Sequence, residues 1–240
     1  MPMRRFLPAL ALLLSALPLS RPALAAGCPA PNDVHPHLHV EVLSDPVQYD
    51  TSKSRAALKG FGTSLASPYA PGTSTHTNGL MRGTIALQSN SGVARQSQSD
   101  GSDNCFWYDQ VTVTIKLAPT IYIAREVPPD SCLYREVLAH ETHHVNVDHE
   151  VAQGFQTTIQ DELAQYVTQV GVAGPYAAAQ KNAIQTKLNQ QLNALVRSWS
   201  VRIQNERLLQ QAKVDTLAEY ERIARACPDE AQEAKETAKP

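Results

Sequence analysis

The sequence predicts an α+β fold in which a small antiparallel β-sheet is followed by two long helices. Two observations carry this prediction. Residues 26–130 contain short runs of β-branched residues separated by Gly, Pro and Ser, which is typical of strands and turns. Residues 131–227 are rich in Ala, Gln, Leu, Glu and Lys and place apolar residues at helical spacing, so we expect them to form the helices.

The first 25 residues have the composition of a secretory signal peptide. Arg4 and Arg5 form a basic start, Phe6 to Leu19 is apolar, and Ala23-Leu24-Ala25 offers small residues for cleavage. The sequence therefore predicts an exported chain, periplasmic or secreted. A second interpretation attaches a lipid anchor to Cys28, although the Leu expected three positions before that cysteine is absent.

The exported chain is moderately acidic. Cleavage after Ala25 removes Arg4, Arg5 and Arg21, which leaves 18 basic against 23 acidic residues and a formal charge of −5. No cluster of Lys and Arg indicates a nucleic-acid partner. The remaining chain of about 215 residues suffices for one domain with a buried core. No second apolar run is long enough to span a bilayer, and residues 228–240 are expected to form a flexible tail.

Four cysteines remain after cleavage. An even count in an exported chain predicts two disulfides, and the spacings fit no zinc site of the cysteine type. Of the three possible pairings, we expect Cys132 with Cys227 and Cys28 with Cys105. The first of these would hold a C-terminal helix against the helix that begins at Cys132.

The clearest strands lie just before the helical part. Gln110–Leu117 alternates apolar and polar residues, and Thr120–Val127 follows after Ala118-Pro119. Both segments are predicted to be half-buried strands, with a corner or bulge at the proline. Leu80–Gln88 is a further predicted strand. The polar, Ser-rich segment from Gln88 to Asp103 shows no periodicity and is predicted to be a loop.

The helical part is expected to contain two long helices. The first runs from Cys132 to about Val170, either unbroken or as two helices that meet at Gly154, and Ser131 is in position to cap it. Gly171 to Pro175 stops it. The second runs from Tyr176 to about Ala226, with an apolar stripe along one face.

The segment His140-Glu141-Thr142-His143-His144 fits the pattern H-E-x-x-H. On a helix, residues i and i+4 share a face, so the imidazoles of His140 and His144 can hold one metal ion. Zinc suits this arrangement because a catalytic zinc takes three protein ligands and keeps one open position. Glu141 lies to the side and is expected to act as the general base toward a water on the metal.

A catalytic zinc needs a third protein ligand, and three candidates lie on the same helix. Asp148 continues the face of His140, but a straight helix carries it about 12 Å away. His149 is the other nearby candidate. Glu162 has roughly the separation seen when a second helix donates a Glu, and this use requires a turn near Gly154.

The cysteines point to a third ligand on the last helix. If the disulfide forms between antiparallel helices, residues at equal counts from its two cysteines lie at equal heights. His140 and Glu219 each lie eight residues from their cysteine, and His144 and Asp215 each lie twelve. We expect Glu219 to be the third ligand, with Asp215 as an alternative ligand or as a hydrogen-bond partner of a His.

The strand pair, the Pro-containing link and the His140-Glu141-Thr142-His143-His144 helix resemble the zincin metalloproteases. Within that group the chain looks like small exported bacterial domains described only as zinc-dependent proteases of unknown function. The resemblance covers about residues 105–227. It implies a zincin-like fold, zinc as cofactor, His140 and His144 as ligands and Glu141 as general base. It also implies that a peptide or protein substrate aligns along Thr120–Val127. The Gly-containing extension of the metzincins is absent.

The function expected from these residues is that of an exported zinc-dependent hydrolase, a peptidase in which Glu141 activates a water on zinc. The alternative is a non-catalytic envelope protein that binds a metal or a partner. A fourth protein ligand, such as His143 or His149, would then close the site to water. The number of protein ligands on the metal therefore distinguishes the two functions, because three leave a position for water and four do not.

Overall fold

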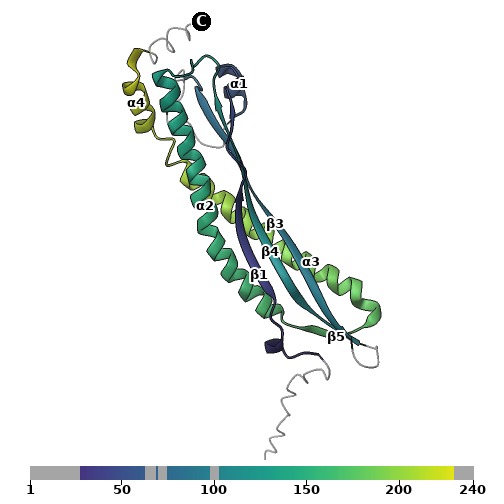
Figure 1. The fold of residues 1–240 in the computed structure, drawn as a ribbon. Coiled ribbons are helices and arrows are strands. Elements are labelled where there is room, and N and C mark those ends of the chain that lie inside the picture. Colours follow the sequence, from purple (N-terminus) through teal and green to yellow (C-terminus); the bar gives the residue numbers. More distant parts are fainter. Residues whose placement is uncertain (1–27, 63–68, 70–74, 98–102, 230–240) are drawn as a thin grey trace, which may run out of the picture.

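The computed structural model describes residues 28–62, 69, 75–97 and 103–229. The signal peptide expected at residues 1–25 and nearly all of the expected tail lie outside the described residues. The described chain is elongated, with a long twisted sheet and two long helices beside it (Figure 1). Among its helices, none combines the length and the apolar composition needed to cross a membrane.

Strand β4 (Asp103–Ile123) is the centre of a five-stranded sheet. β3 (Gly79–Ser97) runs antiparallel along nearly its whole length. Because β3 occupies one side of β4, the other three strands pair along the opposite side. These are β5 (Ala173–Ala177), which is antiparallel to β4, and β1 (His37–Ser44) and β2 (Gln48–Asp50), which are both parallel to it.

The predicted small antiparallel sheet followed by two long helices is therefore wrong. The sheet contains parallel pairings, and the helices pack against it in an α/β arrangement. Alternation of apolar and polar residues shows which face a strand buries, but it does not show which strand pairs with it or in which direction. No pattern in the sequence indicates that β1 and β2 pair in parallel with β4.

The segments predicted as a loop and as a corner are both parts of long strands. Gln88 to Ser97 belongs to β3, and β4 continues through Ala118-Pro119 without a break. Proline lacks the N–H that a central strand donates to its neighbour. Pro119 is tolerated because β1 pairs only as far as Leu117 and β2 begins to pair at Thr120. The proline therefore lies in the gap between two partners.

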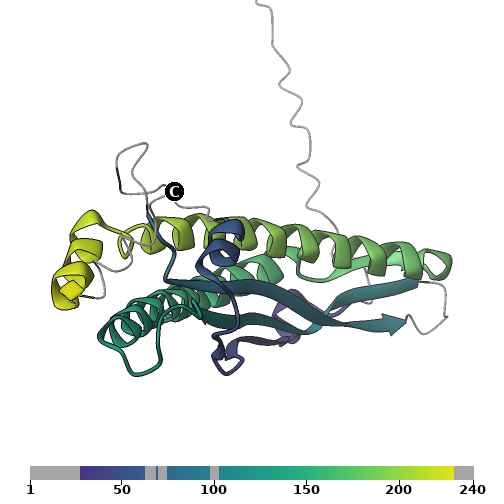
Figure 2. The same ribbon diagram turned by 90° about the horizontal axis from the view of Figure 1, so that it is seen from above.

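One face of the sheet forms the core. It consists of alternate residues of β4 that are fully or almost fully buried: Val111, Val113, Ile115, Leu117, Ile121 and Ile123. Helices α2 (Cys132–Val170) and α3 (Lys181–Gln211) cover the part of this core from Val111 to Leu117 and contribute the buried Trp199 and Ile203. Ile121 and Ile123 belong to a second cluster, which α2 and Ile223 cover. Figure 2 shows α3 lying along the sheet, with α4 (Leu217–Ala226) at one end of the molecule.

The helices differ from the prediction at one place that matters for the site. α2 is a single helix of 39 residues that runs through Gly154, and the Ser131 side chain caps it. The second predicted helix is divided into α3 and α4, with a turn at residues 212–216 between them. The turn places Asp215 outside both helices. The remaining helical elements are short: α1 (Arg55–Gly60) and the 3-10 turns Pro31–Asp33 and Ala178–Gln180.

The two disulfides join the cysteines that the sequence paired. Cys28 is bonded to Cys105, and Cys132 is bonded to Cys227. The second disulfide ties the start of α2 to the end of α4, so the C-terminal segment is held beside α2. Two disulfides fit a compartment outside the reducing cytoplasm.

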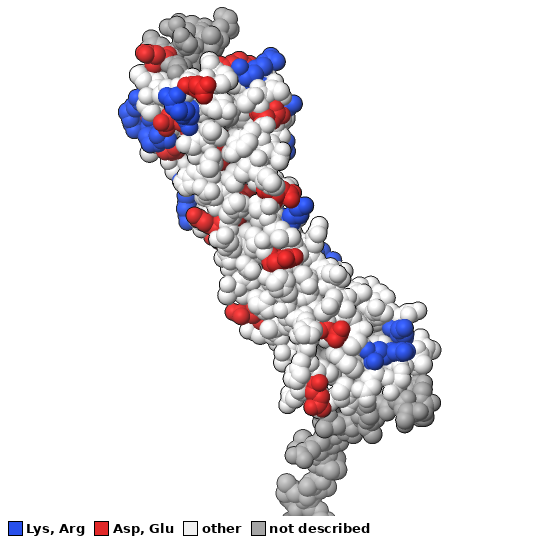
Figure 3. Space-filling view, in the orientation of Figure 1, with Lys and Arg blue, Asp and Glu red and all other residues white. Residues whose placement is uncertain are grey.

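Charged side chains of both signs are interspersed over the molecule. On the face shown in Figure 3, acidic residues are scattered along the whole length, and the densest mixture of acidic and basic residues lies at the end that carries α4. Part of this mixture is an ion-pair network in which Arg222 contacts Glu136 of α2 and Glu219 of α4. The network adds a second connection between α4 and α2, close to the disulfide.

Candidate metal centre

Helix α2 brings His140, Glu141 and His144 together inside the protein. Their exposed fractions are 6%, 5% and 7%. The Nε2 atoms of the two imidazoles are 3.2 Å apart, and the three residues form a group whose ligand atoms all lie within 4.8 Å of one another. The His-Glu-x-x-His pattern therefore forms a cluster within metal-binding distance.

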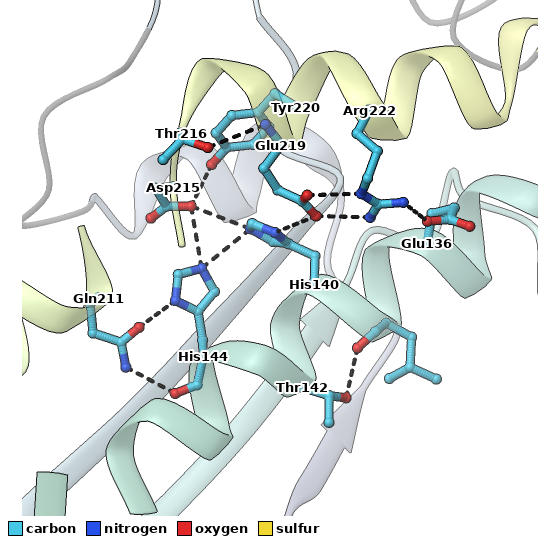
Figure 4. Close-up of polar contacts among 11 residues, drawn as sticks. Glu136, His140, Thr142, His144, Gln211, Asp215, Thr216, Glu219, Tyr220 and Arg222 are labelled. Atoms are coloured by element: carbon cyan, nitrogen blue, oxygen red, sulfur yellow. Dashed lines mark hydrogen bonds and ion pairs between the residues drawn. The ribbon is translucent and has the colours of Figure 1, made fainter. Parts of the chain in front are cut away.

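Asp215 adds a carboxylate oxygen to the two imidazole nitrogens, and these three possible metal-ligand atoms form a triangle (Figure 4). Its Oδ1 is 3.3 Å from His140 Nε2 and 3.2 Å from His144 Nε2. A tetrahedral zinc with bonds of about 2.0–2.1 Å keeps its ligand atoms about 3.3–3.4 Å apart. The three atoms are therefore spaced as three ligands of one zinc ion would be.

Glu219, the first choice for the third ligand, lies on another side of His140. Its Oε1 is 3.6 Å from Nδ1, the ring nitrogen that does not face the triangle. Its carboxylate is also held by Arg222 through two contacts of 2.8 Å. The structure thus places Glu219 on the Nδ1 side of the His140 ring, and Asp215 within 3.3 Å of both Nε2 atoms.

The remaining alternatives lie away from the triangle. His149 Nε2 is 3.0 Å from the hydroxyl of Ser44 in β1. The Glu162 carboxylate accepts hydrogen bonds from the Trp199 indole and from Arg202. Because α2 is unbroken, Glu162 lies eighteen residues and about 27 Å along the helix from His144. Neither side chain can share a metal ion with the triangle.

Counting from the disulfide gave the correct heights along the two antiparallel segments. Residues at equal counts from Cys132 and Cys227 are neighbours in space: His140 with Glu219, His144 with Asp215, and Asp148 with Gln211. The pair of Asp148 and Gln211 was not predicted from the sequence, because positions were compared only as far as His144. The signal was present, since Gln211 lies sixteen residues before Cys227 and Asp148 sixteen after Cys132.

Gln211 is buried beside His144 at the last residue of α3. Its side-chain oxygen contacts His144 Nδ1, and its nitrogen donates to the backbone carbonyl of His144 and to Asp148. Asp148 in turn accepts two hydrogen bonds from Arg207. A chain of polar contacts therefore runs from α3 to the ring of His144.

Glu141 contacts the sheet rather than the turn. Its Oε2 accepts a hydrogen bond of 2.7 Å from the backbone N–H of Met81 in β3. Because β3 pairs with β4 on its other side, this N–H belongs to the edge of β3 that has no strand partner in the described part of the chain. The strand expected to align substrate is paired on both sides at Thr120–Tyr122, by β2 and by β3. It has no free edge there, so that expectation is wrong, and β3 is the strand beside Glu141.

Burial and mutual contacts shift the pKa values of the site. Burial raises the pKa of Glu141, and the nearby imidazoles and the Met81 N–H offset part of this rise. Burial alone would lower the pKa of His144, but the hydrogen bond and charge of Asp215 outweigh it and raise that pKa. Burial would raise the pKa of Asp215, yet hydrogen bonds from both imidazoles hold it well below its ordinary value. Asp215 is therefore held in its ionised form, and its negative charge favours a cation beside it.

Tyr220 of α4 contributes a hydroxyl at the edge of the triangle. The hydroxyl donates to Asp215 Oδ1 at 2.7 Å, and the ring lies 5.5 Å from the His140 ring. Burial, followed by the hydrogen bond to Asp215, raises the pKa of Tyr220. The phenol therefore remains protonated at neutral pH and acts as a neutral donor.

Comparisons of this chain with protein-family models, with curated proteins and with solved structures found no match. The likeness to zincins therefore rests on the His-Glu-x-x-His cluster alone. A function has to be argued from the chemistry of the site.

Gly79 allows β3 to pass close to α2 at the position of Glu141. A Cβ at residue 79 would lie 2.4 Å from Val137 Cγ1 and 2.8 Å from Glu141 Oε1. We expect Gly79→Ala to lower the free energy of unfolding by about 1–3 kcal/mol, because such overpacking forces side chains or backbone to shift. Urea unfolding of the mature chain measures this loss.

Gly154→Ala is the matched control for Gly79→Ala. Beyond its own helical turn, no atom of the described residues lies within 4 Å of the added Cβ, and alanine is favoured over glycine inside a helix by up to about 1 kcal/mol. We expect this variant to be as stable as the wild type or more stable. Equal stability of Gly79→Ala and wild type would show that β3 and Glu141 are not in close contact.

Proposed function

We propose that the protein is an exported zinc-dependent hydrolase, a peptidase, in which His140, His144 and Asp215 hold the metal and Glu141 is the general base. The proposal rests on one observation above all. Asp215 Oδ1 and the two imidazole Nε2 atoms lie 3.2–3.3 Å from one another. Three protein ligands leave one position free, which distinguishes a catalytic zinc site from a closed structural one.

The donor set fits zinc. Two imidazole nitrogens and one carboxylate oxygen are ligands that zinc accepts. The outer nitrogen of each ring lies near an oxygen of the C-terminal segment, since Gln211 contacts His144 Nδ1 and Glu219 lies 3.6 Å from His140 Nδ1. The contact at His144 orients its ring, as outer hydrogen bonds do for metal-binding imidazoles, whereas the 3.6 Å separation at His140 is too long for a hydrogen bond. When bound, zinc supplies a Lewis acid that polarises a carbonyl group and makes a water molecule more acidic.

The protein's own groups supply the proton transfers. Glu141 takes a proton from the attacking water and delivers it to the leaving amine. The Met81 N–H holds Oε2 of this carboxylate, so Oε1 is the oxygen that carries the proton. Burial raises the pKa of Glu141 toward the range in which a carboxyl group both accepts and releases a proton. The Tyr220 hydroxyl donates to Asp215, and it would have to leave this partner to donate to an oxygen that becomes negative.

A peptide is the substrate class that the surrounding backbone favours. The edge of β3 beside Glu141 is free of any strand partner among the described residues. An extended peptide can pair with such an edge through its main chain. Glu141 already occupies the Met81 N–H, and Gln204 occupies the Ile85 carbonyl. A peptide would therefore pair with the other outward-facing groups of this edge, which would bring a peptide carbonyl to the side of Glu141.

Digestion of a peptide library by the mature chain tests the proposed function. We expect the zinc-loaded chain to cleave peptides, a chelator to abolish cleavage, and added zinc to restore it. The absence of cleavage by a chain that binds one zinc per molecule would overturn the hydrolase and favour a non-catalytic metal-binding protein. A chain that binds no zinc would overturn both.

A further inference from the structure

The orientation of the Gln211 amide follows from its partners. Its Nε2 lies 2.9 Å from the backbone oxygen of His144 and 2.7 Å from Oδ1 of Asp148. Both partners are acceptors, so the NH₂ group must face them. The amide oxygen must then face away from them, toward the His144 ring.

This orientation influences which nitrogen of His144 carries a proton. The Gln211 oxygen contacts Nδ1 of the ring, and a carbonyl oxygen can only accept a hydrogen bond. The Gln211 contact therefore favours a proton on Nδ1, whereas the contact with Asp215 favours one on Nε2 in the metal-free ring. A metal at Nε2, which faces His140 and Asp215, takes the place of the second proton and leaves the neutral ring with its proton on Nδ1. Figure 4 shows Gln211 and Asp215 at different nitrogens of the same ring.

The Gln211 amide is anchored by a buried ion pair. Arg207 Nε and Nη2 donate to the two oxygens of Asp148 at 2.7 and 2.9 Å. Asp148 is 2% exposed, and a two-point guanidinium contact fixes both the position and the plane of a carboxylate. The Asp148 oxygen that receives the Gln211 NH₂ is therefore held in place.

We propose that Gln211 is a positioning residue that keeps His144 in the tautomer able to bind a metal through Nε2, and that Asp148 and Arg207 hold Gln211. The inference rests on the proposed metal site and adds a role for three residues that do not touch the metal. His140 has no equal support, because its Nδ1 makes no hydrogen bond within the described part of the chain. The site therefore depends on Gln211 for the better-oriented of its two imidazoles.

Gln204 provides a matched control on the same helix. Its Nε2 donates to the backbone oxygen of Ile85 at 2.9 Å, so it also joins α3 to the rest of the fold through an amide. Gln204 is absent from the chain of contacts that ends at His144. Changing either glutamine to methionine keeps the side-chain length and removes the amide.

Zinc affinity and the tautomer of His144 test the proposal in the full mature chain. Affinity is measured by competition with a chromophoric chelator, and the tautomer by ¹⁵N chemical shifts of the ring in the metal-free and zinc-loaded chains, at a pH where the ring is neutral. We expect Gln211→Met to bind zinc about 10- to 100-fold more weakly and, without metal, to populate the Nε2–H tautomer more than the wild type does. Gln204→Met should bind zinc as the wild type does and keep the wild-type tautomer.

The two measurements separate failure of this inference from failure of the proposed function. Wild-type zinc affinity in Gln211→Met would overturn the inference while leaving the metal site in place. A proton on Nε2 of His144 in the zinc-loaded wild type would do the same, and this result does not depend on any variant folding. A wild-type chain that binds no zinc would overturn the proposed function itself.

Discussion

Glu141→Gln is expected to abolish peptide hydrolysis while leaving zinc bound. A glutamine can still accept the hydrogen bond from the Met81 N–H that Glu141 accepts now, so the fold around the site should not change. An amide cannot take a proton from water, and loss of a general base lowers the rate by about 10²- to 10⁴-fold. The measurement is the initial cleavage rate of a peptide by the zinc-loaded mature chain.

Thr142→Ala is the control for Glu141→Gln. Thr142 follows Glu141 on α2, but its hydroxyl donates to the Leu138 carbonyl of the same helix and is exposed. We expect a nearly wild-type cleavage rate. A Glu141→Gln variant that retains more than about a tenth of the wild-type rate contradicts a role as general base. A variant that loses its zinc instead makes Glu141 a ligand, which its place in the cluster would also allow.

Asp215→Ala is expected to lose zinc, and Glu219→Ala is expected to keep it. Asp215 Oδ1 faces both Nε2 atoms, whereas Glu219 Oε1 lies 3.6 Å from Nδ1 of His140. Removal of an outer partner of a metal ligand typically costs about 10- to 100-fold in affinity. We expect the loss in Asp215→Ala to exceed this range and the loss in Glu219→Ala to fall within or below it.

Competition with a chelator measures both affinities under the same conditions. Circular dichroism and urea unfolding show whether each variant has kept its fold. A larger loss of zinc affinity in Glu219→Ala than in Asp215→Ala would identify Glu219, the residue that the sequence favoured, as the third ligand. Equal zinc affinity in Asp215→Ala and wild type would remove Asp215 from the site.

The positions of Glu219 and Asp215 along α2 could be predicted from the sequence. Which ring nitrogen of His140 or His144 each of them faces could not be predicted. Counting from the Cys132–Cys227 disulfide places Glu219 level with His140, and the two are in contact. The count assumes one continuous helix. The chain instead turns at residues 212–216, between α3 and α4, and this turn directs Asp215 toward the Nε2 atoms. A capping Thr216, followed three residues later by Glu219, marks the start of α4 and is a local sign of the break.

The sheet was harder to predict because its strands depend on distant partners. Gln88 to Ser97 is polar and contains Ser, Asn and Gly, so its own preference is for a loop. It is a strand because β4, with its buried apolar residues, supplies a continuous partner, and such context overrides strand propensity. The same holds for the parallel pairing of β1, since nothing in Gln110–Leu117 indicates the direction of its neighbour.

The central claim is that His140, His144 and Asp215 bind one zinc ion and leave a position open beside Glu141. A crystal structure of the zinc-loaded mature chain, with anomalous diffraction at the zinc edge, tests it most directly. We predict one anomalous peak at about 2.0–2.2 Å from His140 Nε2, His144 Nε2 and an Asp215 oxygen, with a water as the fourth ligand. The absence of a peak between these atoms, or a fourth protein ligand in place of the water, would contradict the account.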